Sequence, residues 1–363
     1  MKIFLVGGAV RDELLGKPIL EKDWVVVGST PEEMIKRGFM PVGKDFPVFL
    51  HPKTKEEYAL ARTERKTAKG YKGFQFYTSA DVSLSEDLIR RDLTINAMAK
   101  DADTGEIFDP YHGQHDLERK LLHHVSPAFA EDPVRILRVA RFAAQLPNFR
   151  VHEDTNHLMQ SMVKSGEVDA LVAERIWKEF SRALTAKEPV RFFEVLKNCG
   201  ALSILFPELH SPQFDLSILE YASEISNDPT VRFAVLLHNL HQKDIQSICN
   251  RFRAPREFTD LCILTAKYLE SYQQLNSRDA KAILDLLKKI DALRRPNRFD
   301  LWVTACNIIT KNLNHRALLF QALEAIRTVD TQSLVKQNYR GQAMAEALSQ
   351  LQQDAIARVF NLS

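Results

Sequence analysis

One stretch near the N-terminus decides the expected fold: Leu20-Glu21-Lys22-Asp23-Trp24-Val25-Val26-Val27-Gly28. Trp and Val are enriched in strands and a Gly closes the run, so the stretch predicts a short β-strand. Side chains alternate across a strand, which directs Glu21 and Asp23 to the same face. Two neighbouring carboxylates repel each other unless a cation lies between them, and their oxygens are preferred ligands of Mg²⁺. Taken alone, the stretch is more typical of an exposed edge strand with two solvated acids.

Composition indicates an ordinary globular protein of two or three domains, with 363 residues of which 45% are hydrophobic and 26% charged. A net charge of +2 does not by itself indicate a nucleic-acid partner. The four cysteines show no C-x-x-C spacing and predict buried thiols in a reducing compartment. The apolar run Ile3–Val6 is a strand rather than a signal peptide, and no run reaches membrane-spanning length.

Strand and helix signals are separated along the chain. Strand patterns lie in the first third, at Lys2–Val6, Asp23–Val27, Val48–His51 and Glu57–Ala61. From about Glu131 onward a 3.6-residue period predicts helices with almost no strand signal. The clearest helices are Glu188–Leu196, Asp215–Ile225, Pro229–His241, Arg256–Tyr272, Arg278–Lys289, Arg298–Lys311, His315–Ile326 and Gly341–Phe360.

These patterns predict an α+β protein, in which a mixed α/β head with a small sheet is followed by a helical neck, body and tail. We expect the head at residues 1–125, the neck at 126–205 and the body and tail at 206–363. Within the head, Asp81–Lys100 predicts a helix. The segment Lys66–Ser79, rich in Gly, Lys and aromatic residues, is the best candidate for a mobile loop.

Two glycines, Gly7 and Gly8, separate the first predicted strand from a helix-forming segment. Such a turn lets the backbone approach an anion, and the following helix start supplies free N–H groups. Arg11 can add a forked donor for a phosphate. A lone Gly-Gly is also typical of a plain strand–helix turn, and the spacings of the dinucleotide fingerprint and of the P-loop are absent.

A third acid, Glu57, lies in the last predicted strand of the head. Alternation places Glu57, Ala59 and Ala61 on one face, and the small neighbours leave space for a ligand. If this strand lies beside the strand that carries Asp23, three carboxylates converge. Such a cluster can hold two Mg²⁺ ions about 4 Å apart, the arrangement used for in-line phosphoryl transfer.

Asp132 and Arg135 are three residues apart at the start of a predicted helix, so both side chains leave the same face. An Arg side chain only donates hydrogen bonds and an Asp carboxylate only accepts them. Together they can complement the edge of a nucleotide base, as a template strand does. The alternative is a surface ion pair worth under about 1 kcal/mol.

In their order along the chain, these motifs resemble those of the polymerase-β-like nucleotidyltransferases. The opening motif is Gly7-Gly8-Ala9-Val10-Arg11-Asp12 followed by Glu21-Lys22-Asp23. Two further stretches resemble the class II subgroup, which holds bacterial CCA-adding enzymes and bacterial poly(A) polymerases: Arg90-Arg91-Asp92-Leu93-Thr94-Ile95-Asn96 and Glu131-Asp132-Pro133-Val134-Arg135. His124-Val125-Ser126-Pro127-Ala128-Phe129 is most similar to the CCA-adding enzymes of the γ-proteobacterial type. The resemblance covers most of residues 1–200.

The resemblance implies a role for each matching residue. Glu21 and Asp23 would bind Mg²⁺ and Glu57 would complete the acidic cluster, while Gly8 and Arg11 would contact the nucleotide phosphates. The other implied nucleotide contacts are Arg91 with Asp92 for phosphate and ribose, Asp132 with Arg135 for the base edge, and Arg138 and Arg141 further along the same helix.

The implied activity is addition of C, C and A to the 3′ end of tRNA from CTP and ATP, with release of pyrophosphate and without a nucleic-acid template. The expected partner is tRNA, held at its acceptor stem and elbow, rather than DNA or a membrane. Two small basic clusters in the helical half, Arg251–Arg256 and Arg294–Arg298, are candidates for phosphate contacts or solvated helix ends. We expect a cytoplasmic monomer.

Two positions depart from the pattern of relatives. Most relatives have Asp where this chain has Glu21, which keeps the charge but adds a methylene. Many relatives carry a C-terminal HD phosphohydrolase domain, and Asn239 stands here where the acid of that His-Asp pair is expected, after His238. An amide oxygen is a weak ligand compared with a carboxylate. We therefore predict no metal-dependent phosphohydrolase activity.

Two alternatives stay open at the level of sequence. One is a poly(A) polymerase of the same superfamily, although no long basic C-terminal extension is present. The other is a catalytically weak tRNA-binding relative, in which Glu21 no longer supports chemistry.

Overall fold

The computed structural model describes residues 1–42, 48–66, 74–209, 215–312 and 314–360. The chain separates into two compact units, Met1–His210 and Ser211–Ser363, and each is described by itself.

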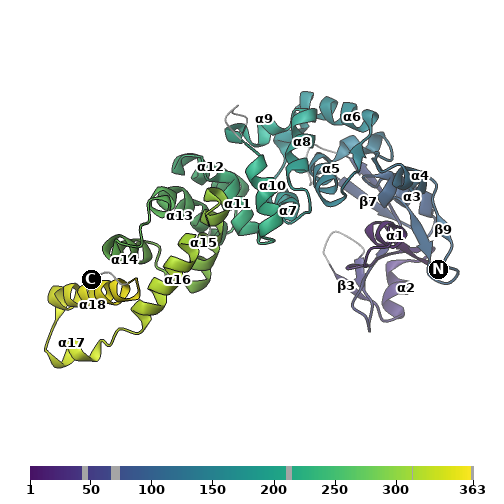
Figure 1. Cartoon of the computed structure of the whole chain (residues 1–363). Helices are drawn as coiled ribbons and strands as arrows, with labels where there is room; N and C mark the ends of the chain where they lie inside the picture. The colour runs from purple at the N-terminus through teal and green to yellow at the C-terminus, as the bar shows by residue number, and fades with distance from the viewer. Residues whose placement is uncertain (43–47, 67–73, 210–214, 313, 361–363) are drawn as a thin grey trace. The chain divides into compact units, whose positions relative to one another are not determined.

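The first unit contains a seven-stranded mixed sheet with strand order β3-β4-β5-β2-β1-β8-β9. Its strands β3 and β9 are labelled in Figure 1, among the purple and blue N-terminal elements. Its strands are β1 (Lys2–Val6), β2 (Asp23–Val27), β3 (Met40–Val42), β4 (Val48–Leu50), β5 (Glu57–Leu60), β8 (Ala99–Asp101) and β9 (Ile107–Phe108). The pair β2 and β5 is parallel, and the other neighbours are antiparallel. All four strands predicted from the sequence are confirmed, with ends that differ by no more than one residue.

The two faces of β2 pack against different helices, because successive side chains point to opposite sides. Val25 belongs to a buried cluster with Leu84 and Leu88 of α3 (Leu84–Ile89). Val26 belongs to a second cluster with Met34 of α2 (Pro31–Lys36). By the same alternation, Asp23 shares the face of Val25, so this acid lies on the side of the sheet that α3 covers.

The helix predicted at Asp81–Lys100 is wrong in extent. Only α3 is α-helical there, and the chain continues through the 3₁₀ turn η2 (Thr94–Asn96) into β8. A capping box between Ser83 and Glu86 starts the helix. Beyond it, the Asp92 carboxylate accepts a hydrogen bond from its neighbour's backbone N–H, Leu93 N, at 2.8 Å, a local bond that competes with the helical pattern.

The prediction of a loop at Lys66–Ser79 is also partly wrong. Strand β6 (Arg62–Lys66) pairs with the antiparallel strand β7 (Phe74–Thr78), so this segment begins and ends in a hairpin. The sequence Phe74-Gln75-Phe76-Tyr77-Thr78 consists mainly of good strand formers, which was the available signal. Residues 67–73 lie outside the described residues.

Helix α5 (Val134–Gln145) is the most buried helix of the first unit's helical part and packs against α7 (Ala173–Leu184) and α8 (Val190–Cys199). Arg135 and Arg141 of α5 are buried with its apolar side chains. The other elements of this unit are α1 (Gly8–Leu14), α4 (Gly113–Glu118), α6 (Glu153–Lys164), α9 (Leu202–Leu205), η3 (Pro127–Glu131), η4 (Glu167–Ala170), η5 (Pro207–Leu209) and the parallel pair β10 (Leu121–Leu122) and β11 (Arg150–Val151).

The second unit is helical throughout its described residues. Its helices are α10 (Ser217–Ile225), α11 (Pro229–Leu237), α12 (Gln242–Phe252), α13 (Arg256–Gln273), α14 (Ala280–Lys289), α15 (Pro296–Thr310), α16 (Asn314–Arg327), α17 (Gln332–Lys336) and α18 (Gly341–Val359). The helices predicted in this half are confirmed, with shifted ends. The four cysteines are free and buried, as expected. Within the described chain, no helix combines the length and the apolar character needed to cross a membrane.

Candidate active site

Asp23 and Glu57 are direct neighbours on the parallel strands β2 and β5. The two strands therefore lie side by side, as the expected acidic cluster requires. Glu21 lies in the loop before β2, because the strand begins at Asp23. All three acids are exposed. Among the described residues, the ligand atoms of Glu21, Asp23 and Glu57 do not gather within 4.8 Å of one another.

The electrostatic surroundings of Asp23 disfavour its negative charge. Partial burial raises the pKa of the Asp23 carboxyl, and the charge of Glu21 raises the pKa further. The guanidinium groups of Arg91 and Arg138 act in the opposite direction but do not cancel the rise. A carboxylate held in this way gains from an added cation, and oxygen donors from Asp and Glu suit a hard divalent ion.

The Gly7–Gly8 turn brings two guanidinium groups close to the backbone. Gly7 has φ of 70°, and a Cβ atom there would lie 3.0 Å from Nη1 of Arg91. A Cβ atom on Gly8 would lie 3.4 Å from Nη2 of Arg11. Glycine thus serves both the left-handed backbone at position 7 and the close approach of the two arginines. The arrangement presents positive charge beside the acidic strand ends.

The fully buried carboxylate of Asp87 orients the Arg91 side chain. The carboxylate lies 2.7 Å from Nη2 of Arg90 and 3.2 Å from Nη2 of Arg91. Burial raises the pKa of Asp87, but the two guanidinium charges outweigh it and lower the pKa below its usual value. In the part of the chain that the structure describes, the buried Nε of Arg91 has no acceptor. The atom of Arg91 that faces the glycine turn is Nη1.

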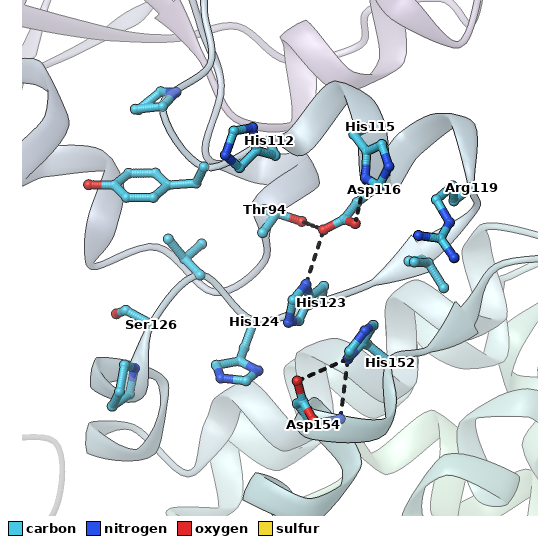
Figure 2. A pocket seen from close by; sticks show the side chains of 15 residues that line it. Thr94, His112, His115, Asp116, Arg119, His123, His124, Ser126, His152 and Asp154 are labelled. Carbon is cyan, nitrogen blue, oxygen red and sulfur yellow. Dashed lines mark hydrogen bonds and ion pairs between the residues drawn. The ribbon is translucent and has the colours of Figure 1, made fainter.

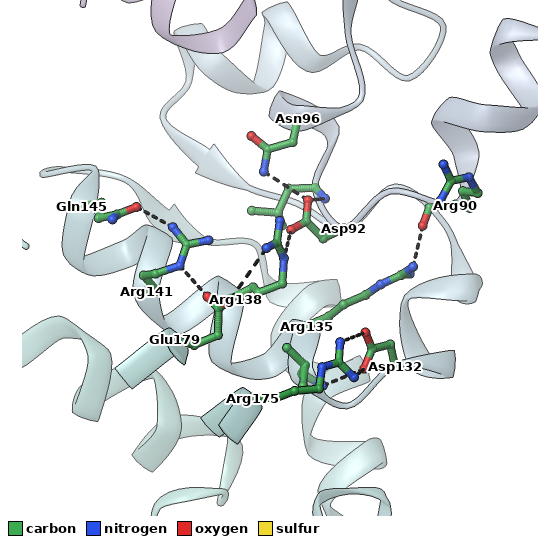
Figure 3. A network of polar contacts seen from close by, with 12 residues as sticks. Arg90, Asp92, Asn96, Asp132, Arg135, Arg138, Arg141, Gln145, Arg175 and Glu179 are labelled. Atoms are coloured by element: carbon green, nitrogen blue, oxygen red, sulfur yellow. Dashed lines mark hydrogen bonds and ion pairs between the residues drawn. The ribbon is translucent and has the colours of Figure 1, made fainter. Parts of the chain in front are cut away.

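Asp92 is the centre of a network that joins the head to α5 (Figure 3). Arg138 donates from Nε to Asp92 Oδ2 at 2.7 Å, and Asn96 donates from Nδ2 to Asp92 Oδ1 at 3.1 Å. Asn96 in turn accepts a hydrogen bond from Arg11 Nη1 at 2.7 Å. Burial alone raises the pKa of Asp92, but the Arg138 charge and these hydrogen bonds lower the pKa far below its usual value. Asp92 is therefore held as a carboxylate.

The network continues to α7. Glu179, also buried, accepts from Nε of Arg141 at 2.5 Å and lies 3.8 Å from Nη1 of Arg138. The guanidinium of Arg141 lies 4.1 Å from the centre of the Phe142 ring. Arg138 and Arg141 are thus oriented by acids and an aromatic ring, while the side chain of Arg138 keeps 36% of its exposure.

Asp132 and Arg135, the predicted base-reading pair, do not lie on one helix as an i,i+3 pair would. Asp132 precedes α5, and only Arg135 lies within the helix. Arg135 donates to the carbonyl oxygens of Ala128 at 2.8 Å and of Arg90 at 2.5 Å. The carboxylate of Asp132 accepts from both terminal nitrogens of Arg175, at 3.0 and 2.7 Å (Figure 3). Each member of the pair is oriented by another part of the first unit.

Sequence reasoning missed the residues that orient others, namely Asp87, Asn96, Arg175 and Glu179. For Glu179 a signal existed: it falls on the apolar face of α7, with the buried Ile176, Phe180 and Ala183. A charged side chain on an apolar face is expected to have a buried partner. For Asp87 the spacing to Arg90 and Arg91, three and four residues on, was a further signal. Arg175 carries none, because its partner Asp132 is 43 residues distant in the chain.

Two family models match the chain. The model described as poly A polymerase head domain matches residues 3–123, and the model described as probable RNA and SrmB-binding site of polymerase A matches residues 148–212. These two matches, together with the carboxylates at the starts of β2 and β5 and the arginines at the glycine turn, define a nucleotidyltransferase of the polymerase-β-like superfamily.

Curated relatives identify the family within this class. The chain is 52% identical over 362 residues to a CCA-adding enzyme of Coxiella burnetii, covering 99% of this chain and 96% of the relative. It is 51% identical over 355 residues to a Multifunctional CCA protein of Pseudomonas putida, covering 96% of each. A solved apo structure of a CCA-adding enzyme has the same fold, with a TM-score of 0.73 at 22% identity, and covers 99% of this chain and 91% of that chain. The chain belongs to the class II CCA-adding enzymes.

Proposed function

We propose that this chain adds C, C and A to the 3′ end of tRNA, using CTP, ATP and Mg²⁺ and releasing pyrophosphate. The observation that carries the proposal is the register pair Asp23 and Glu57 beside the Gly7–Gly8 turn, against which the guanidinium groups of Arg91 and Arg11 lie. The relatives' names support tRNA and its CCA end as substrate and product. As an enzyme acting on tRNA, the chain is proposed to work in the cytoplasm.

The acids Glu21, Asp23 and Glu57 would hold Mg²⁺. Their donor set of carboxylate oxygens suits this ion, and the raised pKa of Asp23 indicates a position that favours an added cation. Bound Mg²⁺ would activate the attacking 3′ hydroxyl and offset negative charge on the triphosphate. Glu21 lies close enough for its charge to act on Asp23, and its longer side chain would let it reach the ion from the loop before β2.

Positive charge for the triphosphate would come from Arg11 and Arg91. Both guanidinium groups lie against the glycine turn. Asp87 orients Arg91, and Asp12 binds Arg11 through Nε at 2.9 Å and Nη2 at 3.0 Å. Forked guanidinium donors held in advance can bind phosphate oxygens with little loss of side-chain freedom. Arg138, oriented by Asp92, would add a third contact to the nucleotide.

Asp132 and Arg135 would select the base. Cytosine presents an N4 amino donor beside acceptors, and adenine presents an N6 donor beside N1, so a carboxylate and a guanidinium can complement either edge. Guanine and uracil present a carbonyl acceptor where these bases present the amino group, and would oppose the carboxylate. The ion pair with Arg175 would orient the Asp132 carboxylate for this task.

The helical second unit would hold tRNA by phosphate contacts. Its basic clusters lie at helix junctions, with Arg253 after α12 and Arg294 and Arg295 before α15. Contacts of this kind position RNA without reading its sequence, as suits recognition of an acceptor stem and elbow by shape. We propose a monomer, which gel filtration with light scattering would test.

The deciding experiment incubates the purified full chain with tRNA lacking CCA, Mg²⁺ and labelled nucleotides. We expect growth by three nucleotides with CTP plus ATP, growth by two with CTP alone, and no growth with GTP or UTP. No incorporation in Mg²⁺ would overturn the proposal.

Two control arms separate the alternatives. Long tails from ATP alone would indicate a poly(A) polymerase, a function that the relatives' names disfavour. Tight tRNA binding without turnover, unchanged in Glu21→Asp, would indicate a binding protein.

A further inference from the structure

A second candidate site lies in the first unit, in a cavity of about 930 Å³ that the proposed nucleotide site does not use (Figure 2). Imidazole rings dominate its lining: His112, His115, His123, His124 and His152. This is a large share of the 11 histidines in the chain. The residues come from α4, from the end of β10 and from the end of β11, so they are brought together only by the fold.

The parallel pair β10 and β11 explains the closest approach in the cavity. Leu121 pairs with Arg150 and Leu122 with Val151, so both strands end at the same edge. His123 and His152 are the next residues on the two strands. Their rings are stacked, with centroids 4.0 Å apart and planes inclined by 19°. Asp154, two residues beyond His152, lies beside the pair (Figure 2).

The hydrogen-bond partners of the two rings indicate which nitrogen of each carries the lone pair. Nδ1 of His123 lies 3.3 Å from Oδ2 of Asp116, so we assign the proton to Nδ1 and the lone pair to Nε2. Nδ1 of His152 accepts a hydrogen bond from the backbone N–H of Asp154 at 3.2 Å, so a metal ion at this nitrogen would replace that hydrogen bond.

Asp116 is a buried acid that holds the His123 ring in place. It is buried, and its Oδ2 accepts a hydrogen bond from Thr94 Oγ1 at 2.7 Å as well as facing His123. A carboxylate on the far nitrogen of a histidine is the usual support of a metal-bound imidazole, because it fixes the ring and makes the other nitrogen more basic.

We propose that His123 Nε2, His152 Nδ1 and the Asp154 carboxylate form a site for a transition-metal ion of the Zn²⁺ or Co²⁺ kind. One ligand atom from each of the three residues lies within 4.8 Å of the others. Because metal–ligand bonds are about 2.0–2.2 Å long, the three ligand atoms must move closer to one another when an ion binds. The Asp154 side chain is 69% exposed and free to rotate for this closure. Solvent in the cavity can complete the coordination.

The donor set separates this site from the proposed catalytic one. Two imidazoles and one carboxylate favour Zn²⁺, Co²⁺ or Ni²⁺, whereas an all-carboxylate set favours Mg²⁺. A metal here would link the ends of β10 and β11 to the first turn of α6 through Asp154, and these bonds would replace the hydrogen bond by which His152 caps that helix. We expect the bound metal to stabilise the fold by mass action.

The test titrates Co²⁺ into the full chain, prepared without a histidine tag and in excess Mg²⁺, which occupies the carboxylate site. We expect one equivalent of Co²⁺ to bind, with visible d–d absorption and a raised melting temperature. His152→Asn keeps a good helix-capping residue but removes the imidazole, and should weaken Co²⁺ binding at least about tenfold. His157→Asn, at an exposed position of the same helix α6, is the matched control and should bind as the parent does.

Two results would overturn the site: no Co²⁺ absorption in the parent chain, or the same absorption and affinity in His152→Asn. Asp23→Asn separates the two metal sites, because it should leave the Co²⁺ signal intact. Loss of that signal in Asp23→Asn would place the ion at the catalytic carboxylates and overturn the proposal. Failure of CCA addition would leave the Co²⁺ result unaffected, so the two proposals fail independently.

Discussion

Arg175 and Asp132 form a bidentate ion pair, with nitrogen–oxygen distances of 2.7 and 3.0 Å. Arg175 lies in α7, whereas Asp132 lies just before α5, so the pair ties two segments that are 43 residues apart. The acid proposed to read the base is therefore oriented by a residue that does not itself need to touch the nucleotide.

Arg175→Lys tests this positioning role. Lysine keeps the charge but cannot offer two parallel N–H donors, so Asp132 should lose its fixed orientation. We expect kcat/KM for CTP and ATP to fall about tenfold, equivalent to about 1.4 kcal/mol, and misincorporation of UTP or GTP to rise. Single-nucleotide incorporation with each of the four nucleotides measures this. Arg182→Lys, at an exposed position of the same helix, is the control, and equal selectivity in both variants would contradict the role.

Asp23→Asn separates catalysis from stability. Because the pKa of Asp23 is raised in the folded chain, its ionised form weakens the fold at pH values above that pKa. The neutral amide should leave the melting temperature, measured without Mg²⁺, unchanged or higher. Activity should fall at least about 100-fold, since a charged contact to the reacting groups is lost. Asp103→Asn, an exposed turn residue, should change neither quantity.

Glu57 and Glu56 form a natural matched pair. Glu57 is the register partner of Asp23, whereas Glu56 accepts a hydrogen bond from Trp24 Nε1 at 3.1 Å, a residue on the opposite face of β2. We expect Glu57→Gln to lower kcat at least about tenfold with tRNA affinity retained. Glu56→Gln should stay near the parent in kcat, because the amide oxygen still accepts from Trp24. Filter binding and incorporation assays measure the two quantities, and equal loss in both variants would refute a specific role of Glu57.

Asp92→Asn should show how much the ion pair between buried Asp92 and partly exposed Arg138 contributes to stability. Because solvent reaches Arg138, loss of this charged hydrogen bond is expected to lower the free energy of unfolding by about 2 kcal/mol at neutral pH. The pKa of Asp92 is lowered in the fold, so its contribution is complete above the unfolded carboxyl pKa of about 3.9 and is lost as pH falls below it. Urea unfolding between neutral and acid pH should show the variant and the parent converging at the acid end. A constant difference at every pH would contradict this linkage.

Much of the fold was predictable, because it depends on local patterns. Apolar runs rich in strand-forming residues, in Lys2–Val6 and Asp23–Val27, marked the central strands, and the 3.6-residue period marked the helices of the second unit. The errors concern the helix predicted at Asp81–Lys100 and the loop predicted at Lys66–Ser79. The helix ends at Ile89 and Asp92 binds Leu93 N in the turn that follows, while Phe74–Thr78 pairs with β6 as a strand.

The sequence by itself determined which chemical groups this protein has: the acids Glu21, Asp23 and Glu57, the arginine-rich motifs and the order that marks the family. Their types and spacing carry that information, because charge, donor capacity and alternation are properties of the chain alone. The tertiary structure decided which groups meet. Only the parallel register places Glu57 beside Asp23, only α7 brings Arg175 to Asp132, and only β10 and β11 stack His123 on His152. Such pairings join residues distant in the chain, so they depend on packing and strand register that no local pattern encodes.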